Sequence, residues 1–86
     1  MSQDYTDKLF MMMVSQLEYG ASVALGVAEN PVTKEKKKDV QQAQFFIDQL
    51  DMLKTKTKGN LTDEETRLLD ACLGRLKMAF VEAGRS

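Results

Sequence analysis

Apolar residues recur every three or four positions in three separate stretches, and this spacing most constrains what the chain can fold into. Such a period places apolar side chains on one face of a helix, whereas a strand would alternate them. We therefore predict an all-α fold. The stripes expected to face the core comprise Phe10, Met13, Leu17, Ala21, Ala24 and Ala28, then Val40, Ala43, Phe46, Ile47, Leu50 and Leu53, then Leu69, Cys72, Leu73, Leu76, Ala79 and Phe80.

Turn and capping residues set the limits of these helices. Pro31 interrupts the chain after the first stretch, Asp39 is a good N-cap for the second, and Gly59 suits the left-handed position after its end. Thr62 and Glu65 have the spacing of a capping box at the start of the third. We expect a single domain, residues 1–86, with a small antiparallel three-helix arrangement. The helices are expected at about 5–27, 40–57 and 63–83.

The composition favours self-association of this small fold. A chain of 86 residues has a thin core, which disulfides, metals or a partner commonly reinforce. One cysteine cannot form an internal disulfide, and without histidine a zinc site has too few ligands, so we expect no metal and no cofactor. A net charge of −1, a single thiol and a start unlike a signal peptide lead us to expect a cytoplasmic protein.

The first helix carries a second uncharged face opposite the one assigned to the core. Gln16 and Glu18 in its middle exclude a membrane span. Small and apolar residues on the back of a helix favour an interface, so we predict contact with a second copy around a two-fold axis, or with another protein partner. A dimer is favoured. The predicted interface consists of Met12, Ser15, Tyr19, Ser22 and Val23, with Phe45 and Met52 from the second helix.

A lysine-rich loop provides the alternative hypothesis, a weak nucleic-acid-associated protein. The lysines that would contact a polyanion are Lys34, Lys36, Lys37 and Lys38. No aromatic residues are interleaved with them for base stacking, and helix-turn-helix spacing is missing. The sequence therefore disfavours nucleic-acid binding.

The residue types needed for catalysis are not gathered in any motif. Without histidine, Ser-His and Cys-His nucleophile pairs are excluded. Cys72 lies on an apolar stripe, where a thiol is structural and unreactive. Asp48 and Asp51 lie three residues apart on one helix, and solvation accounts for such a pair without a metal or acid–base role. We expect no catalytic residues, and the favoured function is a non-enzymatic interaction or structural module.

Several short segments resemble a known family. They are Ala24-Leu25-Gly26, Asn30-Pro31, Asp39-Val40, Ile47-Asp48, Met52-Leu53, Lys56-Thr57-Lys58-Gly59-Asn60-Leu61-Thr62, Arg75-Leu76 and Phe80-Val81. Together they are similar to a bacterial family of short proteins defined only as domain of unknown function number eighteen forty-four. The resemblance implies a small all-helical fold and no known activity. Lys34 departs from the family pattern, which often has glycine after Thr33.

Overall fold

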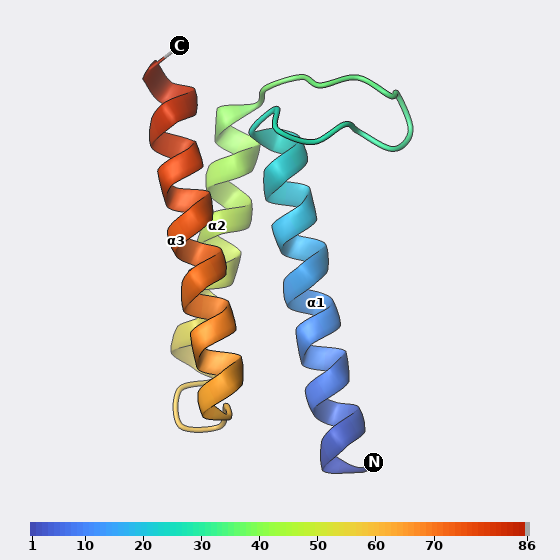
Figure 1. Cartoon of the computed structure of the whole chain (residues 1–86), viewed down its shortest axis with the longest axis vertical. Coiled ribbons are helices and arrows are strands. Elements are labelled where there is room, and N and C mark those ends of the chain that lie inside the picture. The colour runs from blue at the N-terminus through green and yellow to red at the C-terminus, as the bar shows by residue number, and fades with distance from the viewer. Residues whose placement is uncertain (86) are drawn as a thin grey trace.

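Three helices and two connecting loops make up the computed structural model, which describes residues 1–85. The helices are α1 (Gln3–Ala24), α2 (Val40–Lys56) and α3 (Asp63–Arg85), and each runs antiparallel to the one before it (Figure 1). The predicted all-α three-helix fold is therefore confirmed. No helix within the described residues has the length and apolar character needed to cross a bilayer.

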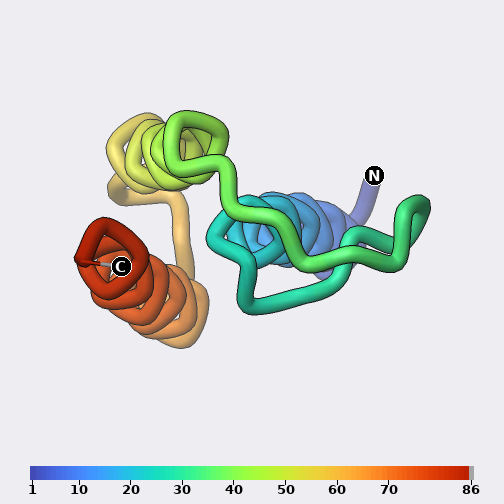
Figure 2. The backbone as a smooth tube through the Cα atoms, turned by 90° about the horizontal axis from the view of Figure 1, so that it is seen from above, coloured from blue at the N-terminus to red at the C-terminus, as the bar shows by residue number. Residues whose placement is uncertain are grey.

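The helices form a three-cornered bundle around one apolar core. Viewed from above, α2 and α3 lie to one side of α1, and the loop between α1 and α2 projects beyond α1, away from the other two helices (Figure 2). The buried apolar residues are Val14, Ala21, Ala24 and Leu25 from α1 and its C-cap, Ala43, Ile47 and Leu50 from α2, and Leu69, Cys72, Leu73 and Leu76 from α3.

The capping residues of α2 and α3 act as predicted. The Asp39 carboxylate accepts the Gln42 backbone N–H at 3.1 Å. Thr62 and Glu65 bond reciprocally: Glu65 N–H donates to Thr62 Oγ1 at 3.1 Å, and Thr62 N–H donates to the Glu65 carboxylate at 2.9 Å. Gly59 has φ +88°, the left-handed conformation expected after a helix end.

The limits of α1 differ from the prediction of 5–27 at both ends. Ser2 caps the helix, because its hydroxyl accepts the Tyr5 N–H at 3.2 Å. At the other end, Gly26 has φ +79° and its N–H bonds to Val23 O at 3.0 Å. Val27 N–H bonds to Ser22 O at 3.1 Å, which completes a Schellman motif. The helix thus stops at Ala24.

The end of α3 also differs, since the helix continues through Gly84 to Arg85 instead of ending at residue 83. Gly84 is not left-handed, so it does not end the helix. The Arg85 guanidinium lies 3.4 Å from the Glu82 carboxylate one turn earlier, a contact that favours helical backbone there.

One position in the core stripe of α1 differs from the prediction. Met13 is 40% exposed, whereas Val14 is buried at 3%. Val14 lies four residues after Phe10 and three before Leu17, so it falls in the centre of the stripe that both of them join. The prediction of Met13 as a core residue was wrong, because both spacings are helical and apolarity alone did not choose between them.

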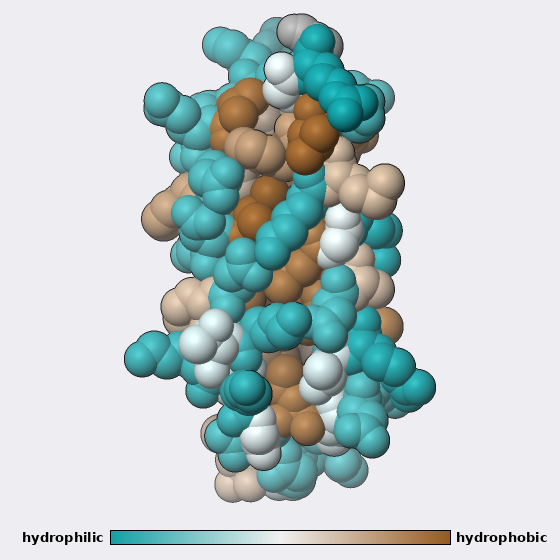
Figure 3. All heavy atoms as spheres, turned by 90° about the vertical axis from the view of Figure 1, so that its left-hand side faces the viewer, coloured by the Kyte–Doolittle hydropathy of each residue, from teal (hydrophilic) through white to brown (hydrophobic). Residues whose placement is uncertain are grey.

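The contact of α1 with α2 differs from the contact of α2 with α3. On α2 and α3, Figure 3 shows a strip of apolar atoms along the long axis, with polar side chains beside it and across it. On α1, Gly20 admits the Phe46 ring of α2 so closely that a Cβ there would lie 2.7 Å from ring atoms. The missing side chain of Gly20 therefore sets the approach of α1 to α2.

Candidate interaction surface

The outer face of α1 is a long, exposed surface with almost no charged residues. Residues 9–28 contain one charged residue, Glu18. Among the predicted interface residues, Met12 is 50% exposed and Tyr19 49%, Ser15 is also exposed, and Ser22 is half-buried. The structure thus places this part of the predicted interface on the side of α1 that faces away from the core.

Glu18 does not interrupt this face, because it points toward α3. Its carboxylate lies 2.7 Å from Arg75 Nη2, and this bond raises the pKa of Arg75. Cys72 lies next to the same carboxylate and is 3% exposed. The one charge in the apolar half of α1 is therefore used to attach the helix to α3.

The Cys72 thiol is held in its neutral form. Burial, followed by the adjacent Glu18 carboxylate, raises the pKa of Cys72 to about 12. A thiol reacts as the thiolate, so this environment opposes reactivity. The structural role predicted for Cys72 agrees with its position in the core.

Tyr19 and Val23 border the loop that follows α1. The Tyr19 hydroxyl donates to the Glu29 carbonyl at 3.0 Å, and Val23 is half-buried. Between this loop, α1 and the start of α2 lies an open cleft of about 840 Å³. Val23, Gly20 and Phe46 contribute apolar lining, and Lys37 from the loop lines it too. The C-terminal half of the outer face is therefore the floor of a cleft.

The loop itself is folded around Asn30. The Asn30 side-chain oxygen accepts the N–H groups of Val32 and Thr33 at 2.8 and 3.2 Å, and Asn30 N–H donates to the Glu35 carbonyl at 2.9 Å. At the end of the loop, Asp39 N–H donates to the Ala24 carbonyl at 2.7 Å. The bonds of Asn30 thus fold the loop, and the bond of Asp39 ties its end to the C-terminus of α1.

The four loop lysines do not share one environment. Lys38 Nζ donates to the Ala83 carbonyl at 3.3 Å, and its aliphatic chain approaches Gly26. Lys37 and Lys38 line the cleft, whereas Lys34 and Lys36 do not, and all four lysines are exposed. Lys38 thus connects the loop to α3, and the four lysines of the predicted polyanion contact differ in what they adjoin.

Phe45 and Met52 form a separate exposed patch. They are 56% and 47% exposed and lie on α2, on the side opposite the buried Ile47. The Phe45 ring meets the Phe46 ring at a centroid distance of 6.3 Å. They belong to a different helix from the α1 face with which the sequence prediction grouped them.

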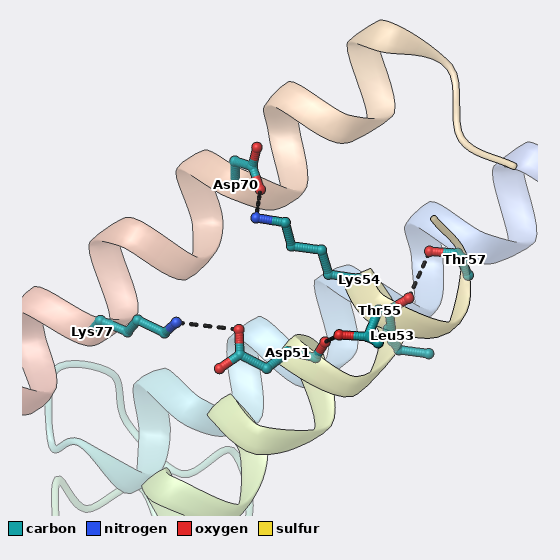
Figure 4. Close-up of polar contacts among 7 residues, drawn as sticks. All are labelled: Asp51, Leu53, Lys54, Thr55, Thr57, Asp70 and Lys77. Carbon is teal, nitrogen blue, oxygen red and sulfur yellow. Dashed lines mark hydrogen bonds and ion pairs between the residues drawn. The ribbon is translucent and has the colours of Figure 1, made fainter. Parts of the chain in front are cut away.

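Two ion pairs join α2 to α3 (Figure 4). The Asp51 carboxylate lies 3.2 Å from Lys77 Nζ, and Lys54 Nζ lies 2.6 Å from the Asp70 carboxylate. The second of these contacts raises the pKa of Lys54, through the hydrogen bond and the charge of Asp70. No group of three or more cysteine or acidic side chains within residues 1–85 is placed to hold a metal ion.

Comparison with known proteins places the chain in a family. The profile named Domain of unknown function (DUF1844) matches residues 7–82, nearly the whole length. The chain belongs to the DUF1844 family. No curated protein and no solved structure matched it.

Lys34 in this DUF1844 chain has an unusual backbone conformation. It has φ 64°, the left-handed region in which glycine is favoured, and it is the one non-glycine residue with positive φ in the described chain. Its N–H donates to the Asn30 carbonyl at 2.8 Å, which closes the turn. A glycine at this position would adopt the same backbone with less strain.

The sequence prediction missed three residues on the outer face of this DUF1844 chain. Tyr5 and Leu9 are 53% and 41% exposed, and Gln16 is also exposed. At helical spacing, Tyr5 and Leu9 continue toward the N-terminus the face on which Met12 and Tyr19 lie, and Gln16 lies between those two residues. Extending the four-and-three spacing one turn before Met12 would have found Leu9, and a further turn Tyr5.

Proposed function

We propose that the protein is a non-catalytic, cytoplasmic interaction module that assembles with itself, as a dimer, through the outer face of α1. The observation that carries the proposal is the exposure of Tyr5, Leu9 and Met12 on one side of α1. Between residues 9 and 28 the only charged residue is Glu18, and it points inward. An exposed apolar surface of this length is typical of an interface. A two-fold axis would cover the same face on both copies.

The non-catalytic part of the proposal is supported by the residue types and their use. The sequence contains no histidine, the commonest general base. The Cys72 thiol is buried and neutral, and Asp51 pairs with Lys77 between two helices. The groups able to do chemistry thus hold the bundle together. The cytoplasmic assignment is supported by the single, buried thiol, which suits a reducing compartment.

The test compares a charge placed on α1 with the same charge placed on α3. Met12→Lys puts an ammonium in the centre of the proposed interface, and we expect its dimer dissociation constant to rise roughly 100-fold, because the charge must be desolvated. Met78→Lys is the matched control, since Met78 is 73% exposed on the outer side of α3. Size-exclusion chromatography with light scattering measures both.

The proposal requires the Met78→Lys chain to keep the parent mass while the Met12→Lys chain becomes lighter. Equal masses for all three proteins at every concentration would contradict it. The same chromatogram tests nucleic-acid binding, because the chain has two tyrosines and no tryptophan. Bound nucleic acid would therefore dominate the absorbance at 260 nm, and we expect no such signal.

A further inference from the structure

The outer face of α1 has the spacing of a coiled-coil seam. Its residues succeed one another at intervals of four, three, four, three and four, as do the d and a positions of a heptad repeat. All of them except half-buried Val23 are exposed. The seam residues are Tyr5, Leu9, Met12, Gln16, Tyr19 and Val23.

The two halves of this seam differ in shape. In the N-terminal half, Tyr5 and Leu9 protrude and are 53% and 41% exposed. In the C-terminal half, Tyr19 and Val23 form part of the floor of the 840 Å³ cleft, which the loop bounds on one side. One half therefore provides large side chains, and the other provides a hollow of the size that large side chains need.

We infer that α1 packs antiparallel against α1 of a second copy, with the N-terminal half of each helix seated in the cleft of the other. This inference rests on the proposed function, and it names the partner and the geometry of the contact. A two-fold axis at the level of Val14 pairs the six seam residues in three layers. Tyr5 meets the partner's Val23, Leu9 meets the partner's Tyr19, and Met12 meets the partner's Gln16.

This pairing is the one that an antiparallel coiled coil requires. Every layer joins an a position to a d position, which is how facing residues meet when two heptad helices run in opposite directions. The macrodipoles of the two helices also run in opposite directions, so unlike ends are adjacent. In a parallel pair, Tyr5 would meet the partner's Tyr5 at one end, and the two clefts would face each other unfilled at the other.

The charges near the seam agree with the antiparallel arrangement. Asp4, in the first turn of α1, would lie at the level of the partner's Ala24, where the lysine-rich loop begins. Lys37 and Lys38 line that cleft together with the acidic Asp39, so an acidic helix start meets a rim of net positive charge. Lys8, which flanks the seam, would face the uncharged Ser22 of the partner subunit.

The centre of the seam allows a close approach. Ser15 flanks the two-fold axis, where it would face the partner's Ser15, and a side chain of this size keeps two helices near each other. A second hollow, of about 420 Å³, lies beside it and is lined by Met11, Met12 and Gln16. The partner's Met12 would reach this region.

Cysteine cross-linking tests the direction of the pair. Met12→Cys and Gln16→Cys are prepared as separate chains and oxidised with diamide, alone and as a mixture. In the antiparallel dimer each new thiol faces the other position, so we expect a covalent dimer in the mixture and at least tenfold less in either chain alone. The parent chain is the blank, because its Cys72 is buried. Met78→Cys, on the outer side of α3, reports collisional cross-linking.

The outcomes separate this inference from the proposed function. Rapid cross-linking of Met12→Cys or Gln16→Cys alone would show a parallel pair and overturn the antiparallel geometry while leaving dimerisation intact. A dimeric mass by light scattering with no cross-link above the Met78→Cys level would place the interface elsewhere and also overturn it. A monomeric mass for the parent chain would overturn the proposed function and this inference together. Circular dichroism checks that each variant keeps the parent helix content.

Discussion

The outer faces of α1 and α3 are made by helices of nearly equal length, 22 and 23 residues, in the same bundle. On α3, Met78 and Val81 are exposed among Lys77, Glu82 and Arg85, so the apolar residues are isolated by charge. On α1, the one charge between residues 9 and 28 faces inward. Helix α3 is therefore amphipathic in the ordinary way, whereas α1 has two apolar sides.

The two helices are also attached differently to the rest of the fold. Helix α3 is joined to α2 by two ion pairs, Lys54–Asp70 and Lys77–Asp51. Helix α1 approaches α2 through Gly20 under the Phe46 ring and reaches α3 through the Glu18–Arg75 pair. The comparison teaches that one small core can hold a helix in place by a narrow inner stripe and leave its other side exposed.

The largest expected effect is a loss of stability at high pH, caused by Cys72, which lies where α1 and α3 meet. The folded thiol has a pKa of about 12, whereas its ordinary value of 9.0 applies once the chain unfolds. The unfolded state thus loses a proton near pH 9 that the folded state keeps until about pH 12. Stability should be unaffected by this group below pH 9, and should then fall by up to about 1.4 kcal/mol per pH unit. Urea unfolding at several pH values measures it.

Cys72→Ala is the control for this pH dependence, because lysine and tyrosine side chains titrate in the same range. The difference in free energy of unfolding between parent and variant should shrink as the pH rises from 9 to 12. A constant difference would mean that the thiol is not protected in the contact between the two helices.

The second prediction compares glycine to alanine substitutions on the two helices. Gly20→Ala should lower the free energy of unfolding by about 1–2 kcal/mol, because the new Cβ displaces the Phe46 ring. Gly74→Ala on α3 has nothing within 4 Å of its Cβ and should stabilise the fold by about 0.5–1 kcal/mol through helix propensity. Thermal unfolding followed by circular dichroism reads both. Equal stabilisation by the two variants would contradict the close contact between Gly20 and the Phe46 ring.

A smaller effect is expected in the loop that walls the cleft on α1. Lys34→Gly relieves the left-handed backbone at φ 64° and should raise the free energy of unfolding by about 0.5–1 kcal/mol. Lys36→Gly removes the same charge without relieving strain, so it should give no gain. If the two variants change stability alike, the effect comes from charge and not from backbone conformation.

The smallest effect concerns salt. If Asp4 meets the basic loop of the partner, raising the ionic strength should weaken the dimer by about two- to threefold, since exposed ion pairs are screened. Asp4→Asn should reduce this salt dependence, whereas Glu82→Gln at the outer side of α3 should leave it unchanged. Sedimentation equilibrium at two salt concentrations measures the dissociation constants. If Asp4→Asn keeps the salt dependence of the parent chain, Asp4 takes no part in the contact between the two copies.

The sequence predicted those features that depend on neighbouring residues alone. The capping box of Thr62 and Glu65, the Asp39 cap and the left-handed Gly59 each need only a few adjacent positions, and all are present. The end of α1 was placed too late, because Gly26 was treated as a helical residue when it forms a Schellman motif.

The candidate surface was predicted in part. Its central residues, Met12 and Tyr19, could be placed by helical spacing from the core stripe. The hydrogen bond from Tyr19 to Glu29, which shapes the cleft, joins residues ten apart in the sequence. No local pattern specifies the path of the chain between them. Phe45 was grouped with α1 on apolarity alone, although the packing of two helices decides which patches adjoin.

The mass of the parent chain in solution tests the central claim most directly. Light scattering across a dilution series should give a value near twice the 9.7 kDa of one chain at high concentration, and a fall toward one chain on dilution. That result would agree with an outer face of α1 that is covered by a second copy. A mass of one chain throughout the series would contradict the account and leave the apolar side of α1 exposed to solvent.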